Sequence, residues 1–261
     1  MTRVKYIAVL LLLGGMVLAQ EGVKFGLRLD PVLGFFSLDS AGKTVRNLSG
    51  SGAFNIRGGL MLSFGFSDNA ALLLGAGIGS YSAKVEYKPG YGITGKTPSG
   101  SDTTIFLAAT GLTSAVTPSY GITTLNVPVW LKLRTNPLGS TPIRAKALLG
   151  GLLDVKVGSV TRSDKVIVSA DFIDQDKTRG GNYVMPFLAQ ASAGAGVDIE
   201  LEGIGTIDFA ITYNHGLINF FNKDFKFDYT DPNGVKISDI KPHEKLKGRL
   251  SNLGFNLMFW F

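Results

Sequence analysis

Residues 54–66 read FNIRGGLMLSFGF, and their side chains alternate between two classes. The even positions carry only apolar residues and one glycine: Phe54, Ile56, Gly58, Leu60, Leu62, Phe64 and Phe66. The odd positions are mixed: Asn55, Arg57, Gly59, Met61, Ser63 and Gly65. Successive side chains of a β-strand point to opposite faces, so a period of two separates the two classes. The stretch therefore predicts a strand with one apolar face and one mixed face.

The same period of two recurs along the chain. It is clear in residues 143–157, 187–199 and 253–261, and it is shorter in 23–29, 125–133 and 207–213. Residues 70–87 form a further strand, whose register the pattern leaves open. Helical periodicity is hard to find, and 34 glycines with 10% aromatic residues suit a chain of strands and turns. The whole pattern predicts eight strands.

The connections between these strands are sorted by length. Short connections at 67–69, 135–142 and 202–205 alternate with long ones at 38–50, 88–120, 160–184 and 221–244. Outer-membrane barrels have short periplasmic turns, long extracellular loops and an even number of strands, and a sheet crosses lipid only when it is closed. We therefore predict an all-β fold: an eight-stranded antiparallel up-and-down transmembrane β-barrel. The alternative is a secreted β-sandwich with an aromatic-rich core.

The first residues resemble a secretory signal peptide. Arg3 and Lys5 precede an apolar run from Tyr6 to Ala19, which is shorter than the ~20 residues of a membrane-spanning helix. We expect residues 1–19 to be a cleaved signal peptide and residues 20–261 to be the barrel, with a buried N-terminal helix as the alternative. Loss of Arg3 and Lys5 would lower the net charge from +6 to +4. The chain has no cysteine, so it has neither a disulfide nor a lipoprotein anchor.

Charged residues gather at the ends of four predicted strands. The interior of an eight-stranded barrel is narrow enough for side chains to fill it. The period of two directs seven charged residues into this interior, near the periplasmic mouth: Lys132, Arg134, Arg144, Lys146, Asp198, Glu200 and Asp208. Buried charges are tolerated when they are paired, so we predict a structural ion-pair network. A pathway for protons or ions is the alternative.

Residues 90–97, GYGITGKT, match the phosphate-binding pattern G-x-x-x-x-G-K-[ST]. A working phosphate loop needs a helix that begins at the lysine, whereas Pro98 and the turn-forming residues PSGSD follow here. We therefore interpret the match as loop composition and expect no nucleotide and no cofactor. The mild positive charge gives no indication of nucleic acid, and no residue spacing suggests a metal site.

The chain offers little for catalysis. Its two histidines are His215, at the outer end of a predicted strand, and His243, at the end of the last long loop. No serine-rich catalytic stretch is directed at either histidine, so we predict that the protein is not an enzyme. A lipid-modifying outer-membrane enzyme that uses one of these histidines is the alternative.

The last strand ends the chain with alternating apolar residues, and Phe255, Leu257, Phe259 and Phe261 resemble the signal that the barrel-assembly machinery recognises. The segments TTLNVPVWLKLR (123–134) and ITYNHGLINF (211–220) and this last strand resemble small outer-membrane barrels of the Bacteroidetes, the PorT type. The resemblance covers the mature chain through loose motifs. It implies an outer-membrane location, and one member of that family is implicated in type IX secretion.

We therefore expect a protein of the outer membrane of a Gram-negative bacterium, with a periplasmic N-terminus and extracellular long loops. The filled polar lumen predicts an envelope-structural or surface-interaction protein, with a role as a secretion accessory open. A narrow porin-like channel for small solutes is the alternative. The expected partners are outer-membrane lipid, the assembly machinery and a protein bound through the long loops.

Overall fold

The structure is a computed structural model, and it describes most of the chain. The described residues are 22–40, 48–51, 53–87, 92–106, 119–162, 184–222, 227–230, 236–240 and 246–261. The predicted signal peptide, His243 and the turn 231–234 lie outside these residues. No helix among the described residues is long and apolar enough to cross a membrane.

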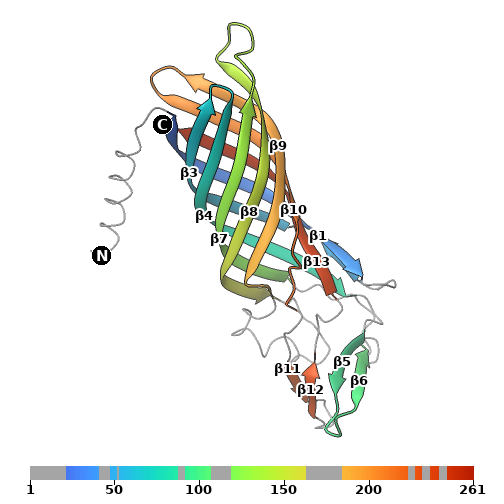
Figure 1. Cartoon of the computed structure of the whole chain (residues 1–261). Helices are drawn as coiled ribbons and strands as arrows, with labels where there is room; N and C mark the ends of the chain where they lie inside the picture. Colours follow the sequence, from blue (N-terminus) through green and yellow to red (C-terminus); the bar gives the residue numbers. More distant parts are fainter. Residues whose placement is uncertain are drawn as a thin grey trace, which may run out of the picture.

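Eight long strands form the body of the molecule (Figure 1). They are β1 (Val23–Ser40), β3 (Ala53–Ser67), β4 (Ala70–Tyr87), β7 (Ser119–Arg134), β8 (Ile143–Arg162), β9 (Phe187–Leu201), β10 (Gly205–Gly216) and β13 (Leu246–Trp260). Each pairs antiparallel with its neighbours in the order β1-β3-β4-β7-β8-β9-β10-β13, and β13 returns to β1. The sheet therefore has no free edge. The predicted eight-stranded antiparallel barrel is confirmed.

Five shorter strands lie in the long connections. The strand β2 (Leu48–Ser51) pairs with β4, and β1 continues to Ser40, well beyond the predicted segment 23–29. The strands β5 (Gly92–Lys96), β6 (Asp102–Phe106), β11 (Phe227–Thr230) and β12 (Lys236–Ile240) form a separate sheet in the order β11-β12-β5-β6. The strands β2, β5 and β6 thus lie where the sequence pattern predicts only loops.

The short turns and the C-terminus share one end of the barrel, and the small sheet lies toward the other end (Figure 1). Two residues, Asp68 and Asn69, join β3 to β4, and residues 202–204 join β9 to β10. Gly203 has a φ of 72°, which glycine adopts without a steric cost and which lets β9 reverse tightly into β10. We call this the short-turn end.

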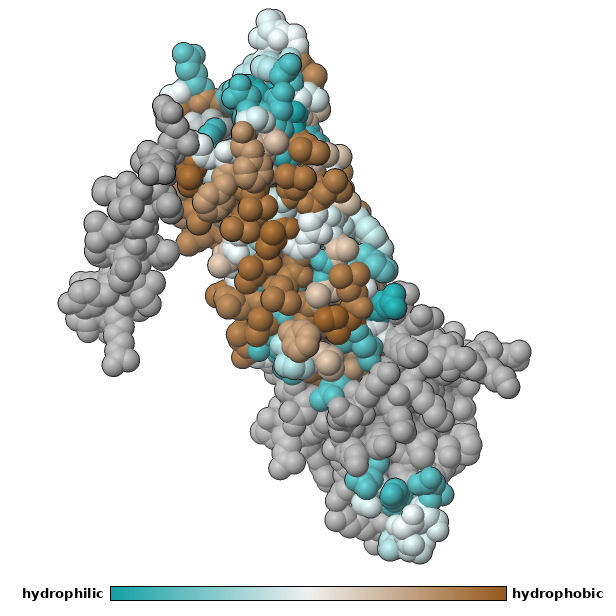
Figure 2. Space-filling model, viewed as in Figure 1, coloured by the Kyte–Doolittle hydropathy of each residue, from teal (hydrophilic) through white to brown (hydrophobic). Residues whose placement is uncertain are grey.

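The outer wall of the barrel is apolar. Exposed leucine, isoleucine, valine and phenylalanine side chains lie on every barrel strand, including Leu29, Ile56, Ile78, Leu153 and Leu257. Figure 2 shows hydrophobic atoms over the middle of one face, with hydrophilic atoms gathered at the short-turn end. Their neighbours in sequence point inward and are buried, as the period of two predicts.

Candidate functional site

The predicted lumen charges meet at the short-turn end. Lys132 Nζ lies 2.6 Å from Asp198 Oδ2 and 2.9 Å from Asp208 Oδ2. Lys146 also pairs with both carboxylates, at 3.4 Å from Asp198 Oδ1 and in close contact with Asp208. All four side chains are almost fully buried. Two ammonium groups and two carboxylates thus form a neutral, alternating cluster inside the barrel.

The remaining three predicted residues extend this cluster to the rim. Arg134 Nη1 lies 3.5 Å from Glu200 Oε1 and 3.7 Å from Asp198 Oδ2, and Arg144 Nε lies 3.2 Å from Glu200 Oε1. The strand register explains the arrangement, because Arg134 is opposite Lys146 and Arg144 is opposite Asp198. The structure thus brings all seven residues into one network, which we call the rim network.

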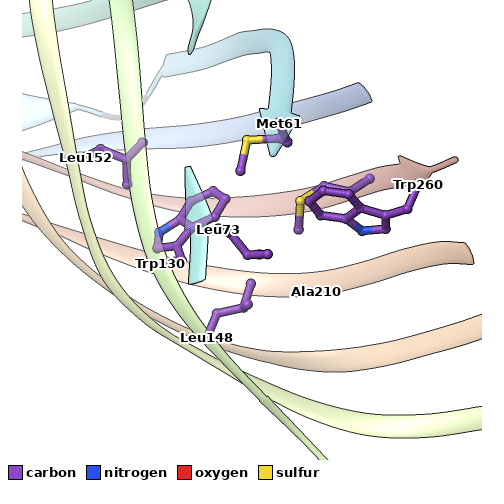
Figure 3. Close-up of a cluster of buried hydrophobic side chains, with 8 residues drawn as sticks. Met61, Leu73, Trp130, Leu148, Leu152, Ala210 and Trp260 are labelled. Carbon is purple, nitrogen blue, oxygen red and sulfur yellow. The ribbon is translucent and has the colours of Figure 1, made fainter. Parts of the chain in front are cut away.

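A layer of apolar side chains crosses the lumen next to the rim network, on the side away from the short-turn end. It consists of Met61, Leu73, Trp130, Leu148, Leu152, Ala210, Met258 and Trp260, and each is at most 3% exposed. Figure 3 shows the labelled side chains directed toward one another inside the ring of strands. They come from six strands around the ring, β3, β4, β7, β8, β10 and β13. We call this set the apolar layer.

The two tryptophans face charges on opposite sides of the apolar layer. The Lys132 ammonium lies 5.8 Å from the Trp260 ring centroid, and the Arg28 guanidinium lies 5.5 Å from that of Trp130. Cations over aromatic faces are attracted by the ring quadrupole. The layer is thus bounded by one charged group on each side, and Arg28 belongs to a second charged cluster.

This second cluster, the central network, was not predicted from the sequence. Arg28 Nε and Arg57 Nε each lie 3.5 Å from Asp30 Oδ2. Arg57 Nη1 donates to the Tyr81 hydroxyl at 3.0 Å, and this hydroxyl donates to Asp154 Oδ2 at 2.9 Å. Two guanidinium groups and two carboxylates balance each other in the middle of the barrel.

Amide side chains continue the central network across the lumen. Arg57 Nη2 donates to Asn252 Oδ1 at 3.3 Å, and Asn214 Nδ2 donates to the same oxygen at 2.7 Å. Asn252 Nδ2 in turn donates to Gln190 Oε1 at 2.9 Å. The network therefore links β1, β3, β4, β8, β9, β10 and β13 through one connected set of polar contacts.

A sequence signal for the central network exists. Arg28 and Asp30 are two positions apart, so they share the lumen face of one strand, and Arg57 is on the lumen face of residues 54–66. A charged residue in the middle of a membrane strand must have a partner inside the barrel. This rule identifies Arg57 as a lumen residue, although it does not name the partner.

Apolar residues also close the lumen near the long-loop end. Val184, Leu188, Phe220, Phe221 and Leu250 are at most 3% exposed, and the rings of Phe220 and Phe221 pack edge to face at 5.4 Å. Val184 and Phe221 form a backbone bridge, and Phe220 N donates to Gly248 O at 2.7 Å. The residues just before β9 and those just after β10 thus pack together at this end of the barrel.

Residues 92–97 of the phosphate-loop match lie in a β-hairpin. Gly92–Lys96 form β5, and Thr97 Oγ1 is 2.8 Å from Ser99 Oγ and donates to Ser101 O at 3.2 Å. The chain then turns back into β6, which pairs with β5 over its full length. At these residues a strand therefore follows the motif where phosphate binding needs a helix.

His215 lies on the outer side of β10, near the long loops. Its Nδ1 is 3.4 Å from both the Tyr213 hydroxyl and Ser251 Oγ. Ser251 is 2% exposed, so its hydroxyl is buried beside the imidazole. Among the described residues, no group of three or more His, Cys, Asp or Glu is arranged to hold a metal ion.

The four residues of the predicted assembly signal lie on the outer face of β13 or just after it. Phe255, Leu257 and Phe261 are exposed. The Phe261 ring stacks on Phe25 at 6.3 Å and packs edge to face on Phe259 at 4.8 Å. Their recognition by the assembly machinery stays a prediction.

The fold defines the class of the protein as a closed β-barrel with an apolar wall, the architecture of outer-membrane barrels. No protein-family model and no curated protein matches the chain, so the PorT-type resemblance stays a prediction. Solved structures match over most of its length. The outer membrane protein OprG of Pseudomonas aeruginosa is 11% identical, with a TM-score of 0.39, over 91% of this chain and 97% of that chain.

Two further solved structures are similar in the same way. Neisserial surface protein A is 10% identical, with a TM-score of 0.34, over 92% of this chain and 100% of that chain. The outer membrane protease OmpT of Escherichia coli is 10% identical, with a TM-score of 0.37, over 93% of this chain and 98% of that chain.

Proposed function

We propose that this chain is an outer-membrane barrel that conducts no solute and acts through its long loops as an envelope-structural or surface-interaction protein. The apolar layer carries the proposal. A hydrated ion crossing the lumen would have to displace Trp130, Trp260, Met258 and their neighbours, which are almost fully buried. Moving charge through an apolar environment without partners is costly, so the layer acts as a septum.

The two ionic networks support the same function. In each of them, cations and anions are already paired with one another at distances of about 3 Å to 4 Å. Paired charges fix neighbouring strands in register, whereas a permeation path needs charges that are free to exchange ions. We therefore assign both networks a structural role and reject the proton or ion pathway as the less supported alternative.

The wall of the barrel supports the membrane location. Water-soluble proteins rarely expose a continuous apolar surface, whereas lipid covers such a surface favourably. Aromatic pairs lie near both ends of the wall: Phe25 with Phe261 at the short-turn end, and Phe35 with Tyr213 at 6.1 Å toward the other end. Aromatic side chains at both interfaces are typical of outer-membrane barrels. We assign the short-turn end to the periplasm.

Planar-bilayer recordings test the proposal. Purified barrel that migrates differently in unheated and boiled SDS gels is added to a bilayer, and a porin of known conductance checks the bilayer. We expect no steady openings from the wild type. Sustained unit conductance would overturn the proposal and favour the narrow channel. The loop partner, and any part in type IX secretion, is to be identified by crosslinking on intact cells.

A further inference from the structure

A cavity opens at the short-turn end beside the rim network. It has a volume of about 390 Å³. Its lining combines cationic, hydroxyl and aromatic side chains, among them Lys24, Ser63, Lys132, Arg134, Thr206 and Trp260, with one carboxylate, Asp68. These come from β1, β3, β7, β10 and β13, so the barrel wall holds the cavity in shape from several sides.

Two hydroxyl groups in this cavity have no partner within the described part of the chain. The Ser63 side chain belongs to a residue that is 9% exposed, and Thr206 is 5% exposed. Among the described residues, no group hydrogen-bonds either hydroxyl. Neither oxygen is among the fully buried polar atoms that lack a partner, so both are accessible from the cavity that the two residues line. Both hydroxyls are therefore available to donate to a ligand.

The charge of the cavity favours an anion. Lys24 is exposed at the rim and forms no ion pair with any described residue, while Lys132 and Arg134 present their outer surfaces to the cavity. The cavity lining carries three cations, Lys24, Lys132 and Arg134, and one anion, Asp68, and of the three cations Lys132 and Arg134 are paired with carboxylates of the rim network. Ammonium and hydroxyl donors in one concave site suit an oxyanion.

We propose that this cavity binds a single oxyanion, a phosphate or carboxylate group, that arrives from the aqueous side of the short-turn end. Lys24 supplies a cation that no described carboxylate pairs with, and Ser63 and Thr206 supply hydrogen bonds to the bound oxygens. Lys132 and Arg134 form the charged wall but remain paired with Asp198 and Glu200. The proposal concerns a ligand site, so it is independent of the closed lumen.

Inorganic phosphate is the first probe, and its ³¹P NMR linewidth is measured against increasing amounts of folded barrel in neutral detergent at constant ionic strength. We expect saturable broadening that acetate reverses by competition. Lys24→Gln and Thr206→Val should each weaken phosphate binding at least about fivefold, since each removes one donor of a charge-assisted contact. Lys96→Gln is the matched control, because Lys96 is an exposed lysine on β5, and it should bind like wild type.

Gel mobility before and after boiling shows that each variant is folded. Nanodiscs of phosphatidylcholine and of phosphatidylglycerol distinguish the source of the oxyanion. If phosphate binds more weakly only in the phosphatidylglycerol nanodiscs, the ligand of the cavity is a lipid headgroup. If phosphate binds equally in both kinds of nanodisc, the ligand is a soluble oxyanion. The proposal is overturned if folded wild type shows no saturable binding, or if Lys24→Gln and Thr206→Val bind phosphate as Lys96→Gln does.

Discussion

Asp208 is fully buried and forms ion pairs with two ammonium groups, those of Lys132 and Lys146. Removing one member of a buried ion cluster leaves uncompensated charge and costs about 3–5 kcal/mol in comparable sites. We therefore expect Asp208→Leu to lower the free energy of unfolding by about 3 kcal/mol, because Asp198 still compensates one lysine. Urea unfolding of the barrel in lipid vesicles, followed by tryptophan fluorescence, measures the change.

A double variant tests whether the loss of charge balance causes the loss of stability. The double variant Asp208→Leu/Lys146→Met removes one charge of each sign, so it should recover more than half of the lost stability. Glu202→Gln changes an exposed carboxylate in the turn between β9 and β10 and should stay within about 0.5 kcal/mol of wild type. A wild-type unfolding curve for Asp208→Leu would show that the rim network contributes nothing to stability.

Gly150 allows β7 and β8 to approach closely. A Cβ at this position would lie 2.0 Å from the backbone oxygen of Val129 and 2.8 Å from Trp130 Cα, so the backbone must shift. We expect Gly150→Ala to destabilise the barrel by about 1–3 kcal/mol, the usual cost of overpacking. Gly158→Ala lies on the same strand, where the new Cβ meets Thr123 at an ordinary 3.7 Å, and it should be nearly neutral in the same urea assay. Equal effects of the two variants would contradict this account.

At the residue scale, the sequence predicted the seven inward charges of the rim network but not the charges of the central network, which meet across the lumen. The members of the rim network lie on adjacent strands at matching heights, so the period of two was sufficient to group them. The central network joins residues far apart in the chain, since Arg57 and Asn252 are separated by 195 positions. Their meeting depends on the strand stagger of the closed barrel, which the alternation pattern does not specify.

At the scale of the element, the strand signal was strong where lipid covers one face and weak elsewhere. The barrel strands were predicted from alternation, whereas β5 and β6 in the long connection were not. Their side chains are not divided between lipid and lumen, so no period of two arises. The match GYGITGKT therefore stood out as a motif, although Gly92–Lys96 are held by pairing with β6.

Deletion of Phe261, the last residue of the chain, tests the predicted assembly signal. Phe261 is 61% exposed, and its backbone N donates to Phe25 O at 2.9 Å. We expect deletion of Phe261 to lower the amount of assembled barrel in the outer membrane severalfold without changing export, because the recognised residue is lost. Heat-modifiable and unassembled protein are to be measured in outer-membrane and periplasmic fractions.

A second measurement separates recognition from intrinsic stability. Phe66→Ala removes another exposed aromatic side chain at the same end of the barrel and leaves the C-terminus intact. Both variants should refold from urea into detergent micelles with yields close to wild type, since no assembly machinery takes part. If deletion of Phe261 impairs refolding in micelles as strongly as it impairs assembly in cells, the residue acts through stability alone.

At the scale of the whole molecule, closure follows from the strands themselves, because β1 and β4 each pair on both edges. The sequence predicted this closure from the sorting of short and long connections, and it predicted a filled interior from the strand number. It did not predict that the interior is divided into two ionic networks separated by the apolar layer. That division depends on the heights at which Trp130 and Trp260 enter the lumen, and these are set by the stagger of the strands.

The orientation of the barrel is a property of the whole chain, and the absence of cysteine makes it measurable. Leu138 is 50% exposed in the connection between β7 and β8 at the short-turn end, and Lys96 is exposed on β5, toward the other end. We expect a membrane-impermeant maleimide to label Lys96→Cys on intact cells and to label Leu138→Cys only after the outer membrane is permeabilised. Both variants replace exposed residues, so both should assemble like wild type in unheated gels. Labelling of Leu138→Cys alone on intact cells would reverse the orientation and would place the oxyanion cavity on the cell surface, where its ligand would have to come from outside the cell.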